Sequence, residues 1–142
     1  MKLISICPSN TELLAYLGLI DQLVAVDDFS DWPNKINSLP KLGPDLSIDM
    51  DKLELYEPDL VLASLSVPGM EKNITELEKR QIPHIVLDPQ SLENIAEDLL
   101  VVGKACGIEE KAQTIASEYL SFIDEMKNRA ATVKNNPRLY WE

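Results

Sequence analysis

Four short apolar runs, separated by longer stretches with helical periodicity, constrain the fold of this chain most strongly. The runs are residues 3–6, 23–26, 59–64 and 84–87. After its first residue the third run is almost continuously apolar, as expected for a strand that is covered on both faces of a parallel sheet. Strands that alternate with helices in this way predict an α/β fold. We expect a Rossmann-like, doubly wound, mainly parallel sheet flanked by helices.

Capping residues predict where several helices begin and end. Ser9 and Glu12 form a Ser-x-x-Glu pattern that is typical of a capping box, and Gly18 can end that first helix in the left-handed conformation. Asp49 is placed to cap a short helix that runs to about residue 57, and Ser91 to cap a helix that ends near residue 106. A further helix is predicted over residues 71–80.

The last predicted helix, residues 109–133, is unusually long for a small domain. After it, residues 138–142 resemble the first residues of another strand. We therefore expect an α/β lobe at residues 1–108, a bridging helix at residues 109–134 and the start of a second lobe at residues 138–142.

Composition favours one soluble globular unit and excludes two classes of partner. The chain has 142 residues, 45% of them hydrophobic, which is enough for one core. Its 13 Lys and Arg residues against 24 Asp and Glu residues give a formal net charge of -11, so nucleic acid and anionic membrane surfaces would be repelled. No apolar stretch is long enough to cross a bilayer, and the first residues lack the features of an export signal.

Three loops are expected to share the carboxyl edge of the sheet, where open α/β sheets bind ligands. Ser9 lies in the first loop, where its hydroxyl and the nearby backbone N–H groups can bind an acceptor or only cap the helix. Phe29 and Trp32 lie in the second loop, and their rings suit a large flat ligand or packing on the protein's own surface. Both interpretations remain open for Ser9, and both remain open for the two rings. The third loop covers residues 64–69.

Residues for metal or catalytic chemistry are sparse. Asp27, Asp28 and Asp31 lack the spacing of an EF-hand calcium loop, so we interpret them as a solvated acidic loop and predict no metal site. His84 is the only histidine, which leaves a zinc site or a histidine-based triad short of partners. The five glycines form no nucleotide-binding motif. Cys106 continues an apolar helical stripe and is expected to be a buried free thiol.

Three motifs in a fixed order resemble the cobalamin- and siderophore-binding proteins of ABC importers. S-N-T-E follows the first predicted strand, F-S-D-W-P follows the second, and P-D-L-V leads into the third. Each motif alone is common, but the combination is specific, and the resemblance covers nearly the whole chain. It implies two similar α/β lobes joined by one long helix, with the ligand held between them.

The resemblance also implies roles for particular residues. In cobalamin binders of this family the positions matching Ser9 and Phe29 contact the corrin, whereas Lys41 and Ser64 stand where relatives often carry aromatics. A family glutamate that docks on arginines of the permease matches Glu71. Together with the predicted loops, this gives the ligand-binding candidates Ser9, Phe29, Ser30, Trp32, Lys41, Ser64 and Ser66.

The leading hypothesis is therefore a binding protein without catalytic activity. Its expected ligand is cobalamin, another corrinoid or a ferric siderophore, its expected partner is an ABC permease, and no further cofactor is expected. The family acts in the periplasm or from a lipid anchor, while the chain as given leaves a cytoplasmic location open. Two alternatives on the same fold are an enzyme or metal-insertion component, suggested by the two thiols, and a cytoplasmic corrinoid-handling or sensor protein.

Overall fold

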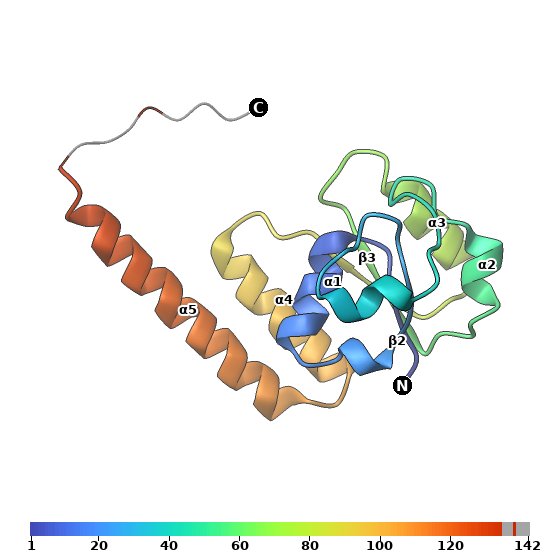
Figure 1. Ribbon diagram of the computed structural model, residues 1–142, viewed down its shortest axis with the longest axis horizontal. Coiled ribbons are helices and arrows are strands. Elements are labelled where there is room, and N and C mark those ends of the chain that lie inside the picture. The colour runs from blue at the N-terminus through green and yellow to red at the C-terminus, as the bar shows by residue number, and fades with distance from the viewer. Residues whose placement is uncertain (135–137, 139–142) are drawn as a thin grey trace.

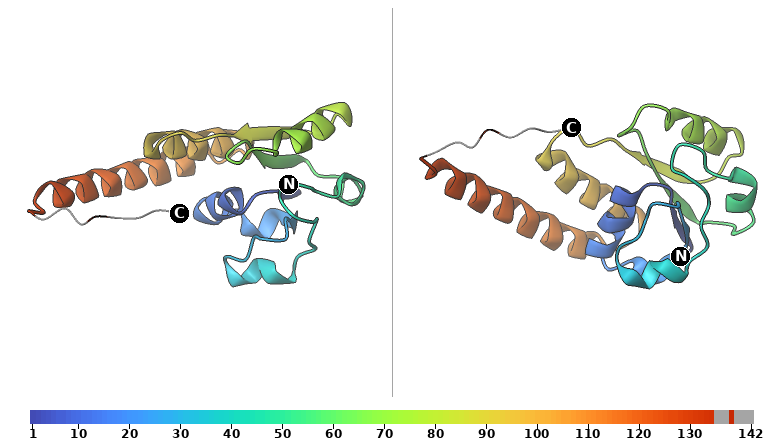
Figure 2. Two further views of the ribbon diagram at one scale, coloured as in Figure 1. Left: turned by 90° about the horizontal axis from the view of Figure 1, so that it is seen from above. Right: turned by 45° about the horizontal axis from the view of Figure 1, so that its top comes forward.

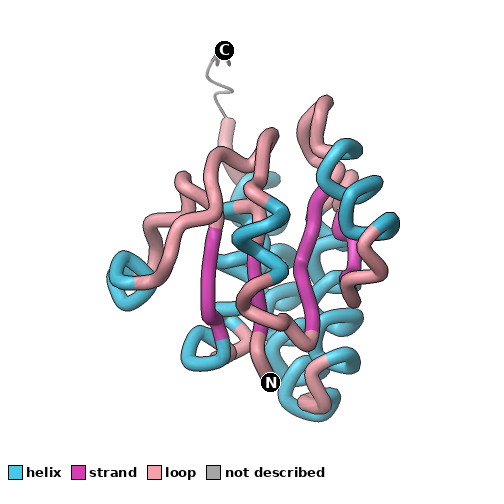
Figure 3. The backbone as a smooth tube through the Cα atoms, turned by 90° about the vertical axis from the view of Figure 1, so that its right-hand side faces the viewer, coloured by secondary structure: helices cyan, strands magenta, loops and turns pink. Residues whose placement is uncertain are grey.

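The protein contains a parallel sheet of four short strands. The computed structural model describes residues 1–134 and 138. The strands are β1 (Leu3–Ser5), β2 (Leu23–Val26), β3 (Leu60–Ser64) and β4 (His84–Leu87), in the order β2-β1-β3-β4. Every neighbouring pair is parallel, and Figure 3 shows the strands side by side with loops gathered at their ends. The prediction of a mainly parallel sheet is confirmed.

Helices follow the strands along the chain (Figure 1). The α-helices are α1 (Pro8–Tyr16), α2 (Met50–Glu54), α3 (Glu71–Lys79), α4 (Leu92–Ala105) and α5 (Glu109–Ala131). Two 3₁₀ helices, η1 (Ile20–Gln22) and η2 (Asn34–Ser38), lie on either side of β2 in the sequence.

The sheet has a hydrophobic core on each face. Leu3 packs in one core with Leu14 of α1 and Val102 of α4, whereas the next residue, Ile4, packs in the other core with Leu77 of α3. All five side chains are fully buried. Successive residues of a strand point to opposite faces, so β1 supplies both cores. Helices thus cover both faces, which confirms the doubly wound fold.

Helix α5 packs along α4 and then extends past the end of the sheet (Figures 1 and 2). Its buried side chains are Ala112, Ala116 and Ile123. Near its C-terminal end, the Lys127 ammonium lies 2.7 Å from the Glu93 carboxylate of α4. A single long helix at this position confirms the predicted helix.

Two of the three predicted N-caps are confirmed and one is wrong. The side chains of Asp49 and Ser91 each accept the backbone N–H three residues further on. The first helix instead begins after Cys7, with Pro8 as its first residue, so Ser9 lies inside the first turn. Proline has no N–H to lose and a fixed φ that suits the first helical position, which moves the helix start two residues earlier.

Three smaller expectations concern the thiols and the chain end. Cys7 is buried and Cys106 is only partly buried, so full burial of the second thiol was wrong, although both are free. The strand start expected at residues 138–142 lies outside the described residues apart from Arg138. Within the described chain, none of the helices has the length and apolar character needed to span a membrane.

Candidate ligand-binding site

The order of the strands places the crevice expected of an open α/β sheet at the carboxyl end of β1. The chain leaves β1 for β2 on one side and then returns across β1 to β3 on the other side. Ligands of open α/β sheets bind at such a reversal. At this point the Asn10 amide of α1 donates a buried 3.0 Å hydrogen bond to the Ala63 carbonyl oxygen of β3. The first turn of α1 is therefore fixed beside the β3 loop.

Large apolar side chains are exposed on the loops around this crevice. Phe29, in the loop after β2, is 58% exposed, and Leu65 and Val67, after β3, are each 41% exposed. Ser9 is also exposed, at the start of α1. Exposed apolar side chains on adjacent loops form a surface that a ligand or partner can cover. Sequence analysis did not single out Leu65 and Val67, which alternate with two serines in a loop.

Trp32 lies beside α1. Its ring centroid is 6.3 Å from that of Tyr16, with an angle of 41° between the ring planes, and about half of its surface remains exposed. Trp32 therefore has a packing partner within the protein. Its remaining exposed surface is free to contact a ligand.

Ser30 belongs to a buried polar network. Its hydroxyl lies 2.5 Å from Asp27 Oδ1 and 2.8 Å from the Thr11 hydroxyl of α1, and the Thr11 hydroxyl donates to Ser5 of β1 over 2.8 Å. Asp27 Oδ2 accepts the backbone N–H groups of Phe29 and Ser30 over 2.8 and 3.0 Å. Asp27 is fully buried, so the prediction of a solvated acidic loop was wrong at this residue. Burial raises the pKa of Asp27.

Asp28 and Asp31 are exposed, as predicted for an acidic loop. Asp28 Oδ1 accepts the Gly43 N–H over 3.1 Å. From the same neighbouring segment, the ammonium group of Lys41 donates to the Ser30 carbonyl oxygen. Lys41 thus holds the loop that carries Phe29, and it is partly buried.

Ser64 and Ser66 form a small turn at the end of β3. The Ser64 hydroxyl accepts the Ser66 N–H over 3.1 Å and lies 2.8 Å from the Ser66 hydroxyl. Ser64 is 4% exposed, whereas Ser66 is exposed. Ser66 is therefore the residue of this pair that is accessible from the surface.

Glu71 begins α3 and is exposed. Its carboxylate accepts the backbone N–H of Gly69 over 2.7 Å, and Gly69 has a φ of +106°, a conformation that favours glycine. Hydrogen bonds from its own backbone N–H and from that of Gly69 lower the pKa of Glu71. The carboxylate is thus ionised and holds the end of the β3 loop.

An apolar groove of about 590 Å³ lies where α1, α4 and α5 meet. Tyr16, Tyr119 and Phe122 contribute aromatic surface, and Glu12 and Asp98 contribute carboxylates. Burial raises the pKa of Asp98. Periodicity within single helices could not reveal this groove, because it forms only where three helices come together. Its lining includes Ser9 and, on α5, side chains between Ile115 and Phe122.

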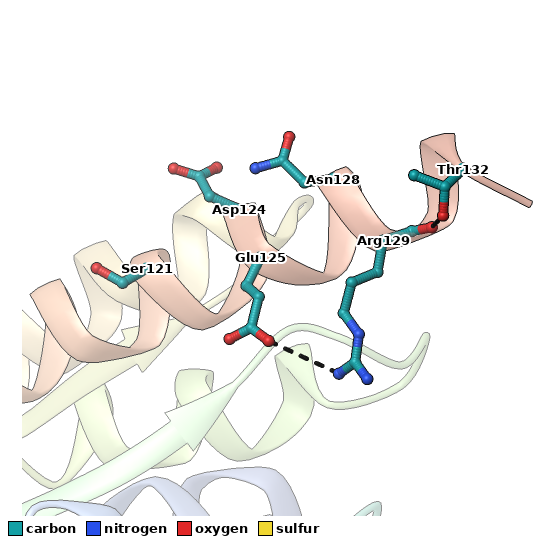
Figure 4. A pocket seen from close by; sticks show the side chains of 6 residues that line it. All are labelled: Ser121, Asp124, Glu125, Asn128, Arg129 and Thr132. Carbon is teal, nitrogen blue, oxygen red and sulfur yellow. Dashed lines mark hydrogen bonds and ion pairs between the residues drawn. The ribbon is translucent and has the colours of Figure 1, made fainter.

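A second hollow is only a stretch of helix surface. Figure 4 shows its six side chains, five on α5 and one, Thr132, at the C-cap of that helix, with an ion pair of 3.7 Å between Glu125 and Arg129. No other element forms a wall among the residues that line it, so this hollow does not enclose a ligand.

Metal-ligating side chains do not gather in the part of the chain that the structure describes. Among residues 1–134 and 138, no three His, Cys, Asp or Glu side chains lie where they could hold a metal ion. His84 Nδ1 lies 2.8 Å from the Ile82 carbonyl oxygen at the start of β4, which gives this histidine a local structural partner.

Solved structures share this fold. The periplasmic vitamin B12 binding protein of Vibrio cholerae superposes with a TM-score of 0.83 at 23% identity, covering 92% of this chain and 51% of that protein. A periplasmic heme-binding protein from Roseiflexus gives a TM-score of 0.84 at 21% identity, covering 96% of this chain and 52% of that one. At these identities the likeness shows the fold alone.

The sequence is similar to curated ABC-transporter and vitamin B12-binding proteins and matches a family model. An ABC transporter substrate-binding lipoprotein of Bacillus subtilis is 29% identical over 137 residues, which are 95% of this chain and 43% of that protein. A vitamin B12-binding protein of Yersinia pestis is 29% identical over 130 residues, which are 92% of this chain and 46% of that protein. The chain thus spans about half the length of the curated relatives it matches. The family model described as periplasmic binding protein matches residues 3–142, and the chain therefore belongs to the periplasmic binding protein family.

Proposed function

We propose that this chain is one lobe of the substrate-binding component of an ABC importer and forms one wall of a cleft that holds cobalamin, another corrinoid or a related metal chelate. The observation that carries this proposal is the exposed apolar surface of Phe29, Leu65 and Val67 at the carboxyl edge of the sheet. Large flat ligands are held mainly through such surface, with a few polar groups that fix their orientation.

Polar groups are available beside that surface. Ser9, in the first turn of α1 after β1, and Ser66, in the loop after β3, are both exposed at this edge of the sheet. They can bind the polar substituents at the edge of a macrocycle, while Phe29 covers its face. The relatives named for vitamin B12 and heme support a metal chelate as the class of ligand.

Delivery to a permease is the second part of the proposal. Glu71 is exposed and ionised at the start of α3, so its charge can meet an arginine on a membrane partner. Glu71 also follows the β3 loop directly. A single residue would therefore lie next to both the ligand surface and the docking surface.

Isothermal titration of the two-lobed parent protein with cyanocobalamin, cobinamide, hemin and a ferric siderophore tests the proposal. We expect heat with at least one of these chelates, and much weaker binding by the 142-residue chain, because one lobe supplies only one wall of the cleft. Absence of heat with all four would overturn the ligand class. Equal affinity of the 142-residue chain and its parent would overturn the cleft.

A further inference from the structure

We propose that Asp27 positions the loop that carries Phe29, and that it does so as a neutral carboxylic acid whose proton completes a chain of hydroxyl groups leading to the start of α1. The effect on ligand affinity rests on the proposed function, whereas the protonation of Asp27 does not. The inference comes from a count of protons along the buried network.

Four oxygen–oxygen contacts of 3.0 Å or less lie in series, and a longer contact of 3.4 Å joins the Thr11 hydroxyl to the Cys7 carbonyl oxygen. The Ser5 hydroxyl is 3.0 Å from the Cys7 carbonyl oxygen, the Thr11 hydroxyl is 2.8 Å from the hydroxyls of both Ser5 and Ser30, and the Ser30 hydroxyl is 2.5 Å from Asp27 Oδ1. Each of the four contacts needs one proton. The three hydroxyl groups supply only three, because each carries a single hydrogen.

The directions of the hydrogen bonds locate the missing proton. Ser5 donates to a carbonyl oxygen, which has no hydrogen, and Thr11 donates to Ser5. The proton between Thr11 and Ser30 must then come from Ser30. If Ser30 gave its proton to an ionised Asp27 instead, two buried oxygens would face each other at 2.8 Å without one. A proton on Asp27 Oδ1 satisfies all four contacts.

The second carboxyl oxygen agrees with this assignment. Asp27 Oδ2 accepts two backbone N–H groups, from Phe29 and Ser30, which uses both lone pairs of a carbonyl oxygen. In a neutral carboxylic acid one oxygen carries the proton and donates, and the other can accept two hydrogen bonds, which is the pattern proposed for Asp27 Oδ1 and Oδ2. Burial favours the neutral form and raises the pKa of Asp27, although the hydrogen bonds from Ser30 and Phe29 act in the opposite direction.

Surrounding charges do not offset the burial of Asp27. Asp45 acts on it in the same direction as burial, and none of the ion pairs among the described residues involves Asp27. Lys41 is bonded to the carbonyl oxygen of Ser30, and β1 contributes only the uncharged Ser5. The remaining charged groups on the same loop and on α1 are exposed carboxylates, namely Asp28, Asp31 and Glu12.

The network connects the two loops proposed to bind the ligand. The Phe29 turn is held at one end by Asp27, and the other end of the chain reaches the Cys7 carbonyl oxygen two residues before Ser9. Loss of the Asp27 proton would leave one oxygen–oxygen contact without a hydrogen and would bury a charge that has hydrogen-bond donors but no cation beside it. The loop would then lose its fixed position relative to α1.

Asparagine and alanine at position 27 separate the possible roles. Asp27→Asn reproduces the neutral acid, since its NH₂ group can donate to Ser30 and its oxygen can accept both backbone N–H groups. Asp27→Ala removes both functions. If Asp27→Ala fails to fold, Ser30→Ala serves in its place, because it breaks the same chain of hydrogen bonds. Asp31→Asn changes a neighbouring exposed carboxylate and is the matched control.

The protonation state can be measured on the 142-residue chain without any ligand. The carboxyl ¹³C resonance of Asp27, identified by its absence in Asp27→Asn, should keep its neutral position to a pH above the ordinary pKa of 3.8. Titration near the ordinary value of 3.8 would overturn the neutral acid. Asp31→Asn should leave the resonance unchanged.

Affinity of the two-lobed parent for cyanocobalamin and hemin measures the positioning role. We expect Asp27→Asn and Asp31→Asn to stay within about twofold of wild type, and Asp27→Ala to bind roughly tenfold more weakly. Wild-type affinity should fall as the pH rises through the raised pKa of Asp27, and that of Asp27→Asn should not. Equal affinity of Asp27→Ala and wild type would overturn positioning. If wild type bound neither probe, the proposed function would fail while the carboxyl titration still decided the protonation.

Discussion

Gly103 of α4 faces Ala112 of α5 so closely that a methyl group at position 103 would overlap the Ala112 side chain. The same methyl group would lie 3.6 Å from Ala112 Cα. Two long helices can therefore pack with their backbones in close approach. This contact fixes the start of α5, and with it the direction in which the helix leaves the sheet.

Gly103→Ala should destabilise the fold by about 1–3 kcal/mol, because the added methyl forces α4 and α5 apart. Thermal unfolding measures the loss. The double variant Gly103→Ala with Ala112→Gly exchanges the two side chains and should recover much of it. Equal melting temperatures for the single variant and wild type would show that the helices adjust without cost.

The elements of the fold could be predicted from the sequence because they depend on local patterns. The buried run of β3 and the caps at Asp49 and Ser91 are set by residues within a few positions of one another. The Ser-x-x-Glu pattern predicts a cap at Ser9, but Pro8 suits the first helical position and the helix begins there. Pro8 is thus a local signal for the start of this helix.

The site could be predicted only in part, because the direction of a loop side chain depends on tertiary contacts. Phe29 was placed on the carboxyl edge, and the structure exposes it there. Ser30, one residue later, has its hydroxyl in the protein interior, where Thr11 and Asp27 bind it. The order of polar and apolar residues in a loop does not predict which of their side chains a neighbouring helix will bury.

Asn10 should be required for stability although it lies on a short polar helix turn. Its buried amide donates to the Ala63 carbonyl oxygen, and loss of such a bond costs about 1–3 kcal/mol. Asn10→Asp should be at least as harmful as Asn10→Ala, because a carboxylate would face that oxygen. Chemical denaturation measures both, with the exposed Asn128→Asp as control. Stability equal to wild type in Asn10→Asp would contradict the assigned bond.

Phe29→Ala in the two-lobed parent should weaken chelate binding by about 1–3 kcal/mol with little change in melting temperature, since the ring is already mostly exposed in this lobe. Leu55, which is 82% exposed at the end of α2, offers a control: Leu55→Ala should change neither quantity. A large fall in melting temperature with affinity intact would assign Phe29 to the fold instead.

The ion pair between Glu93 and Lys127 should make the packing of α5 on α4 sensitive to pH. Lys127 lowers the pKa of Glu93, so its contribution to stability is complete above the ordinary value of 4.5 and is lost as the pH falls through the lowered pKa. Conversely, Glu93 raises the pKa of Lys127, and that contribution is lost as the pH rises through the raised value.

Lys127→Ala should therefore return the pKa of Glu93 towards 4.5, as followed by the side-chain carboxyl resonance of Glu93 in NMR. Lys79→Ala removes a comparable exposed ammonium from another ion pair and should leave Glu93 unchanged. An unaltered Glu93 titration in Lys127→Ala would show that the pair does not form in solution. High salt should weaken the same effect, because both groups are exposed.

Glu71 has two roles to separate, since its carboxylate holds the Gly69 N–H and is also the proposed contact with a permease arginine. Glu71→Gln keeps an oxygen that can accept from Gly69 but removes the charge, whereas Glu71→Ala removes both. Docking that depends on charge predicts normal ligand affinity with slowed uptake in both variants, because a charge-assisted contact is lost in each. A purely local role predicts normal uptake in Glu71→Gln. Reconstituted transport in vesicles distinguishes these outcomes, with Glu78→Ala as an exposed control on the same helix.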